Sequence, residues 1–155
     1  MASQGLQKGG RPVKKTSRVI SRKEMGKATL NNIIDMSLTF SAMIRLFKND
    51  MKKKLHKGLT KTVKDVCKAK SEEEFRKIHS QFCEWGKENI CLAKEDKRPS
   101  YGQIAKTLDV VLKVAVYFCG LPDPDKSKQL RPWLNPAVDT KMMKKLRECY
   151  PKAIR

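Results

Sequence analysis

The sequence lacks an apolar run of the roughly 20 residues that a transmembrane helix needs. Its longest candidate, residues 110–119, is interrupted by Lys113. The basic N-terminal residues are not followed by the apolar block of a secretory signal. We therefore expect an intracellular protein of the cytoplasm, a nucleoid or a virion, with no membrane span.

Closely spaced cysteine pairs are also missing. The five cysteines stand at positions 67, 83, 91, 119 and 149, and none forms a Cys-x-x-Cys pair. Structural zinc sites draw such pairs from two places in a chain, and here only His79 and Cys83 are close. We expect no metal or other cofactor, and reduced cysteines that mostly pack in the core; one disulfide in an oxidising setting is the alternative.

The usual catalytic signatures are absent. There is no glycine-rich phosphate loop and no nucleophile elbow. The acidic group at 72–74 is explained by the start of a helix, where negative charge is stabilising. Asp123 and Asp125 look superficially like part of a metal-nuclease string, but no strand pattern carries them. The sequence favours a non-catalytic protein, with a metal-dependent enzyme acting on nucleic acid as one alternative.

Helical periodicity dominates what the sequence does contain. Apolar residues recur at steps of three and four, and no segment is typical of a β-hairpin. Residues 1–28 are rich in glycine and lysine, with few large apolar side chains. The pattern predicts an all-α, bundle-like or orthogonal domain of five to six helices over residues 29–155, preceded by a flexible basic arm over residues 1–28.

The first half of the domain is predicted to contain three helices. One apolar stripe indicates a long helix that Thr29 caps and Gly58 stops. A shorter helix is expected over 60–69. Ser71 and Glu74 have the spacing of a capping box and predict the start of the next helix. Trp85 lies on the apolar stripe of that helix, so we expect it in the core.

The second half should hold the central core helix, over residues 101–119, capped by Ser100. A narrow polar stripe that includes Asp109 is predicted along it. Two further helix starts are expected where a capping side chain precedes proline, at 123–124 and 135–136. Between them, Trp133 is predicted to close one end of the core.

The imbalance of charge is the strongest functional signal. The chain has 35 Lys and Arg against 16 Asp and Glu, a net charge of +19. The excess is segregated: +7 in residues 1–28, +5 in 45–57 and +5 in 141–155. A small domain needs a net charge of only roughly 2 to 8 to remain soluble. The charge of this chain is far larger, so a polyanion partner is favoured.

The predicted function is therefore binding and packaging of DNA or RNA, chiefly through phosphate contacts, as a coat, nucleoprotein or chromatin-like protein. Self-association into a larger assembly is possible in this reading, and a basic subunit that meets acidic proteins is the other alternative. The candidate binding residues are the clustered cations Arg11, Lys14, Lys15, Arg18, Arg22, Lys23, Arg45, Lys52, Lys53, Lys54, Lys141, Lys144, Lys145 and Arg147.

Overall fold

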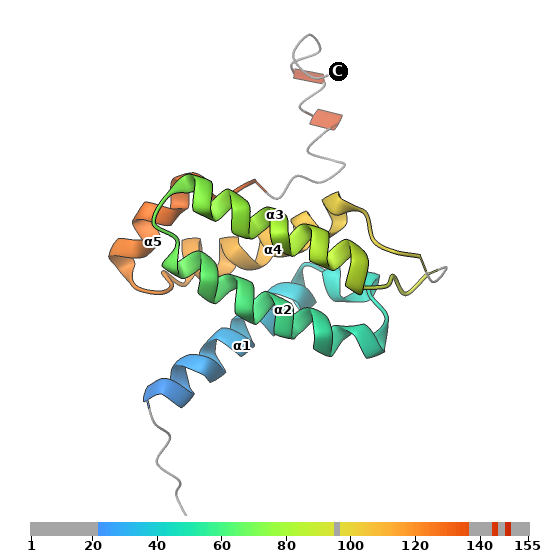
Figure 1. The fold of residues 1–155 in the computed structure, drawn as a ribbon, viewed down its shortest axis with the longest axis horizontal. Coiled ribbons are helices and arrows are strands. Elements are labelled where there is room, and N and C mark those ends of the chain that lie inside the picture. The colour runs from blue at the N-terminus through green and yellow to red at the C-terminus, as the bar shows by residue number, and fades with distance from the viewer. Residues whose placement is uncertain (1–21, 95–96, 137–143, 146–147, 150–155) are drawn as a thin grey trace, which may run out of the picture.

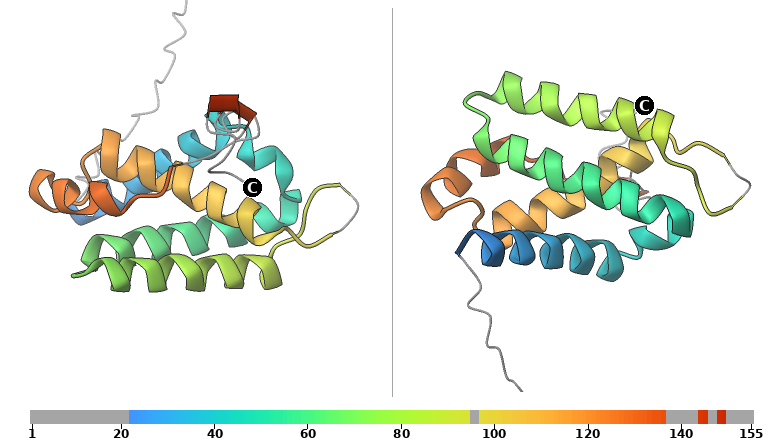
Figure 2. Two further views of the ribbon diagram at one scale, coloured as in Figure 1. Left: turned by 90° about the horizontal axis from the view of Figure 1, so that it is seen from above. Right: turned by 60° about the horizontal axis from the view of Figure 1, so that its bottom comes forward.

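The computed structural model describes residues 22–94, 97–136, 144–145 and 148–149 (Figure 1). Within these residues the fold is an all-α bundle. Its helices form two layers, with α2 (Asn49–Lys68) and α3 (Glu72–Asn89) in one layer (Figure 2). The other layer contains α1 (Arg22–Phe40), α4 (Tyr101–Leu112) and α5 (Pro124–Leu130). No helix in the described ranges has the length and apolar character that a bilayer span requires.

The prediction of one long helix from Thr29 to Gly58 is wrong, because the helix is interrupted between α1 and α2. Ala42 adopts a left-handed conformation with φ of 57°, and a short 3-10 helix, η1 (Met43–Leu46), follows it. Just before the break, the hydroxyl of Ser41 donates to the carbonyl of Ser37 at 2.6 Å. Such back-bonding by serine weakens the end of a helix.

The start of α1 also differs from the prediction. The helix begins at Arg22, so Thr29 is an internal residue and not its cap. The rest of the predicted arm, residues 1–21, lies outside the described residues.

The prediction that Gly58 stops a helix is wrong, because this residue lies inside α2. A Cβ atom at this position would lie 2.6 Å from two ring carbons of Trp85 on α3. Glycine therefore allows the two helices to approach closely, and the predicted helix over 60–69 is the second half of α2. Trp85 packs at the edge of the core and is half-buried, not inside it as predicted.

The predicted helix starts at Ser71, Ser100 and Asp123 are confirmed. The Ser71 hydroxyl accepts from the Glu74 amide at 3.2 Å, and Ser100 forms a full capping box with Gln103. Asp123 caps α5, which has proline at its first turn. The central helix continues from α4 into a π-helical segment, η2 (Lys113–Phe118), which ends one residue before the predicted end at 119.

A single core joins the two layers. Its fully buried side chains include Phe47, Phe75, Leu55, Leu108 and Leu130. The long connection after α3 is held to the chain before α2 by backbone hydrogen bonds, including Lys48 N to Cys91 O at 3.1 Å. At the far end Trp133 packs on Phe75 with a centroid separation of 6.3 Å, as predicted for a residue that closes the core.

The cysteines are less buried than predicted. All five are free thiols, and only Cys83 is buried. Cys67 and Cys91 are half-buried, whereas Cys119 and Cys149 are exposed. Burial raises the pKa of the Cys67 thiol to about 11, so this side chain stays protonated at neutral pH.

Candidate nucleic-acid interface

A row of five lysines runs along the outer side of α2. All five are exposed, and they recur at steps of three and four, so they share one face of the helix. The row extends over about 21 Å at 1.5 Å per residue. It lies opposite the fully buried Leu59 and Val66. We call this set the α2 lysine stripe, and its members are Lys54, Lys57, Lys61, Lys64 and Lys68.

The stripe is poorly neutralised by the part of the chain that the structure describes. Within the described ranges no carboxylate forms an ion pair with any of its lysines. Only Lys54 has a hydrogen-bond partner there, the side-chain oxygen of Asn89 at 3.0 Å. α2 as a whole has seven lysines against two aspartates, a net +5, whereas α3 has three cations against five glutamates, a net −2. Positive charge is therefore concentrated on one helix of this layer.

A groove of about 420 Å³ lies between α2 and α3, beside the stripe. Three stripe lysines line it, together with Gln81 and Trp85 from α3. The Trp85 ring is held by Phe82, with centroids 5.5 Å apart, and by its approach to Gly58. The groove thus combines cations with a half-buried aromatic ring.

A second hollow, of about 390 Å³, lies on the other side of α2, toward α1. Its lining includes Lys52, Lys53, Lys57 and His56. The Nε2 atom of His56 lies 3.3 Å from a carboxylate oxygen of Asp35 on α1. Because Lys57 lines both hollows, the stripe and the predicted cations at the start of α2 form one basic surface.

The predicted site residues fall into three groups: those on η1 and α2, those at 144–145, and those whose side chains the structure does not describe. Lys52, Lys53 and Lys54 lie together on the first turns of α2, where Lys52 donates to Asn49 at 2.6 Å. Arg45 is exposed on η1, next to Ile44, which lines the second hollow.

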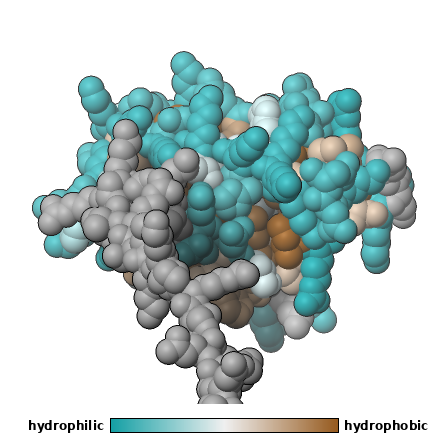
Figure 3. Space-filling view, turned by 90° about the horizontal axis from the view of Figure 1, so that it is seen from below, coloured by the Kyte–Doolittle hydropathy of each residue, from teal (hydrophilic) through white to brown (hydrophobic). Residues whose placement is uncertain are grey.

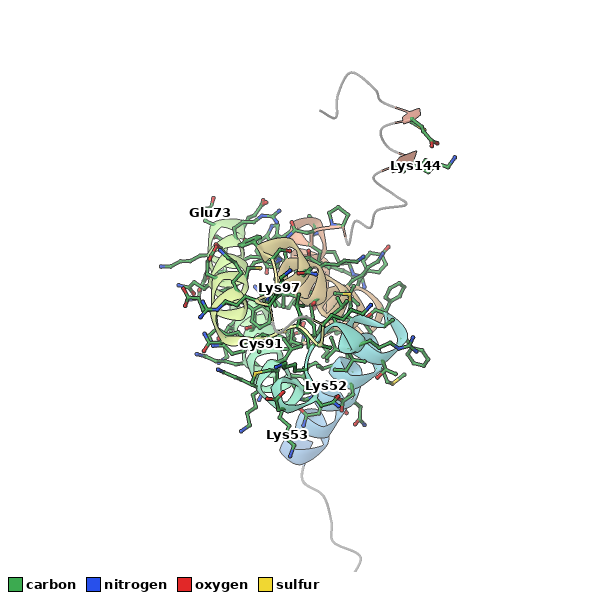
Figure 4. All side chains as sticks on the ribbon, turned by 90° about the vertical axis from the view of Figure 1, so that its right-hand side faces the viewer. Lys52, Lys53, Glu73, Cys91, Lys97 and Lys144 are labelled. Carbon is green, nitrogen blue, oxygen red and sulfur yellow. The ribbon has the colours of Figure 1, made fainter. Side chains whose placement is uncertain are left out.

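Figure 4 shows the side chain of Lys53 directed away from the core, with Lys144 well apart from Lys52 and Lys53. Lys144 and Lys145 are exposed, and Lys145 pairs with Glu148 at 3.2 Å. The structure therefore does not join these lysines to the α2 surface.

The remaining candidates belong to the N-terminal and C-terminal segments of the chain. The backbone of Arg22 and Lys23 is in α1, but their side chains are not described. Outside the described residues are Arg11, Lys14, Lys15, Arg18, Lys141 and Arg147.

The face of the molecule around α1 has a different character. Between Thr29 and Phe40 this helix has no lysine or arginine. It exposes Met36 and Phe40 instead, the latter at 82%. Figure 3 shows apolar surface near the centre of this face and hydrophilic side chains around it. Among the residues whose side chains are described, the cations are therefore concentrated on α2 and not on this part of α1.

A buried polar cluster was not predicted from the sequence. The His79 Nε2 atom on α3 lies 2.8 Å from Oδ1 of Asp109 on α4, and the Cys83 sulfur lies 3.7 Å from His79 Nδ1. The side-chain amide of Asn135 lies 3.3 Å from both the histidine and the carboxylate. Arg76 donates to the side-chain oxygen of Asn135. Asp109 is buried at 8% exposure, so the prediction that it lies on a wet polar stripe is wrong for this residue, whereas Lys113 and Tyr117 of the same stripe are exposed.

The cluster contains the groups of a thiol nucleophile with its base, but it is closed. Such chemistry needs a substrate to reach the sulfur, and Cys83 has no exposed surface. Burial alone lowers the pKa of His79, but the hydrogen bonds and charges of Asp109 and Cys83 outweigh it and raise the pKa to about 9. The arrangement suits a charged histidine paired with a carboxylate, which ties α3, α4 and the segment at Asn135 together.

No group of three or more His, Cys, Asp or Glu side chains in the described part of the chain could hold a metal ion. Asn135, predicted to cap a helix, directs its side chain into the buried cluster, and the segment that would form that helix lies almost wholly outside the described residues.

Four members of the stripe, Lys57, Lys61, Lys64 and Lys68, are not among the predicted site residues. They continue the helical spacing that begins at Lys54. The predicted helix stop at Gly58 hides this spacing, because it assigns the lysines to two separate helices.

The chain matches no protein-family model, no curated protein and no solved structure with which it was compared.

Proposed function

We propose that this protein binds nucleic acid without catalysis, and that it coats or packages it through contacts of lysine side chains with backbone phosphates. The observation that carries this proposal is the α2 lysine stripe. Five exposed cations in a row on a rigid helix, with no carboxylate paired to them in the described ranges, offer phosphates a preorganised surface. The surplus charge of the whole chain, +19, points to the same class of partner.

The position of the lysines supports binding rather than solubility alone. Cations that only keep a protein soluble can be spread over its surface, with both signs interspersed. Here the neighbouring helix α3 carries a net negative charge while α2 carries +5. In this proposal the basic residues of the N-terminal segment and of the C-terminal residues add further phosphate contacts.

The test compares two variants of equal net charge. One changes Lys57, Lys61 and Lys64 to Glu. The control changes Lys77, Lys113 and Lys128 to Glu, which are also exposed but lie on α3, η2 and α5. Affinity for duplex DNA, single-stranded DNA and RNA is measured between 50 and 200 mM salt, the range over which phosphate binding weakens steeply.

We expect the stripe variant to lose far more affinity than the control. The slope of log affinity against log salt should fall by about 0.9 for each duplex phosphate contact that is removed. Equal losses in the two variants would mean that only net charge matters, and the stripe would not be the site. A stoichiometric complex with an acidic protein, without salt-dependent affinity for any nucleic acid, would instead support the protein-interaction alternative.

A further inference from the structure

The groove between α2 and α3 has features that phosphate binding alone does not need. Its floor includes the half-buried ring of Trp85, and its other wall carries the amide of Gln81. Three cations, Lys54, Lys57 and Lys61, stand along its α2 side. Duplex DNA bound by its backbone would use the lysines and leave the ring unused.

The Trp85 ring is fixed in this place by its surroundings. Gly58 gives it room against α2, since a Cβ there would lie 2.6 Å from the ring. Phe82 supports it with a centroid distance of 5.5 Å and an interplanar angle of 35°. A ring held in this way loses little conformational entropy when a second planar group stacks on it.

We propose that this groove binds a base of a single-stranded nucleic acid, stacked on Trp85 while the flanking phosphates contact Lys57 and Lys61. This inference rests on the proposed function and names its substrate class. Proteins that bind single strands combine a basic groove for the backbone with aromatic side chains on which bases stack. The bases of a duplex are already stacked on their neighbours and would have to be extruded first.

Charge decides between this occupant and a protein partner. Three lysines face the groove against one carboxylate, Asp65. A strand of nucleic acid supplies both the regular negative charge for the lysines and a planar ring for the tryptophan. The Gln81 amide can both donate and accept hydrogen bonds, as the edge of a base requires.

The experiment uses tryptophan fluorescence, because the chain has only two tryptophans. In a Trp133→Phe variant, Trp85 is the sole reporter, and phenylalanine can keep the contact with Phe75. Three probes are titrated at low salt: an oligothymidylate of about 12 nucleotides, an abasic strand of the same length, and a duplex. The abasic strand presents the same phosphates without bases.

We expect the oligothymidylate to quench Trp85 and to bind about 5- to 150-fold more tightly than the abasic strand, which is the range for one stacked base. The abasic strand and the duplex should bind through phosphates without quenching. In a Trp85→Leu variant the preference for bases should vanish while affinity for the abasic strand remains. The quenching measurement needs no change at Trp85, so it decides the question even if that variant does not fold.

The outcomes separate the two proposals. If the oligothymidylate and the abasic strand bind equally and neither quenches Trp85, the base-stacking proposal is wrong and phosphate binding stands. Binding of none of the three probes would overturn both. Quenching by an acidic peptide but not by the oligothymidylate would assign the groove to a protein partner.

Discussion

At the scale of single residues, Gly58 controls how α2 packs on α3. Alanine is favoured over glycine in a helix by about 1 kcal/mol, but its Cβ would lie 2.6 Å from the Trp85 ring. Forcing extra volume into packed side chains costs about 1–3 kcal/mol. We therefore expect Gly58→Ala to lower the free energy of unfolding by up to about 2 kcal/mol, measured by urea denaturation.

Gly102 provides the matched control for this prediction. It lies in the first turn of α4, and a Cβ there would meet no atom within 4 Å. Gly102→Ala should raise the free energy of unfolding by up to about 1 kcal/mol. If the two substitutions were equally stabilising, Trp85 would not lie against α2, and the groove would lack the wall that our inference needs.

The pair of His79 and Asp109 predicts a dependence of stability on pH. The pKa of His79 is raised from 6.5 to about 9 in the folded protein. A group with a raised folded pKa contributes its full stability below its unfolded pKa and loses it as the pH rises through the folded value. The free energy of unfolding should therefore fall between pH 6.5 and about 9.

The control for this prediction is Asp109→Asn, which removes the carboxylate that faces the histidine. Breaking a buried ion pair from one side costs about 3–5 kcal/mol, so the variant should be markedly less stable at neutral pH. Its stability should also fall less between pH 6.5 and 9, because the histidine pKa is no longer raised by Asp109. Parallel curves for the two proteins would show that other groups, such as Cys83 beside the ring, cause the dependence.

At the scale of helices, the interruption between α1 and α2 leads to a further prediction, which concerns Ala42. Ala42 has a φ of 57°, a conformation that costs an L-residue about 1–2 kcal/mol and glycine almost nothing. Replacing Ala42 by glycine removes this conformational cost, but part of the gain in stability is offset because glycine is more flexible in the unfolded chain. Ala42→Gly should raise the free energy of unfolding by up to about 1 kcal/mol.

Ala105→Gly inside α4 tests the same exchange in an ordinary helical conformation. It should lower the free energy of unfolding by about 1 kcal/mol, so the two variants should shift the urea midpoint in opposite directions. A loss of stability in Ala42→Gly would contradict the left-handed turn at this position.

Helical class and most helix starts could be predicted from the sequence because they depend on local chemistry. Ser71, Ser100 and Asp123 each cap the helix that follows them. The break at Ala42 could not be predicted, because no glycine or proline marks it and the apolar spacing continues across it. Gly58 led to the opposite error, a predicted helix end where the helix continues. The glycine is needed there for close packing against the Trp85 ring, which lies on another helix.

The candidate site, like the fold, could be predicted from the sequence only in part. Lys52, Lys53 and Lys54 are adjacent in the sequence and were found, whereas the later stripe lysines depend on the true length of α2. The partnership of His79 and Asp109 joins residues thirty positions apart. Nothing local to either residue indicates it, because it arises only when α3 packs against α4.

At the scale of the whole molecule, the net charge of +19 acts on the free and the bound protein in opposite ways. In the free protein the cations repel one another, and this self-repulsion destabilises the compact state. Added salt screens that repulsion. When nucleic acid is bound, its phosphates neutralise the same cations, and salt weakens the complex by competing with the phosphates.

The melting temperature should therefore respond to salt with opposite signs in the two states. Raising salt from 50 to 200 mM should increase the melting temperature of the free protein, by about 2–4 °C for each kcal/mol of repulsion that is screened. In the presence of excess oligonucleotide the melting temperature should start higher and fall over the same range, because a ligand that binds only the folded state stabilises it by RT ln(1 + [L]/Kd) and salt raises the Kd. The variant Lys57→Glu, Lys61→Glu, Lys64→Glu should lose most of the second effect, whereas the equally charged control variant should keep it. Two curves that rise together would mean that the surplus charge serves solubility and that the α2 lysine stripe binds no polyanion.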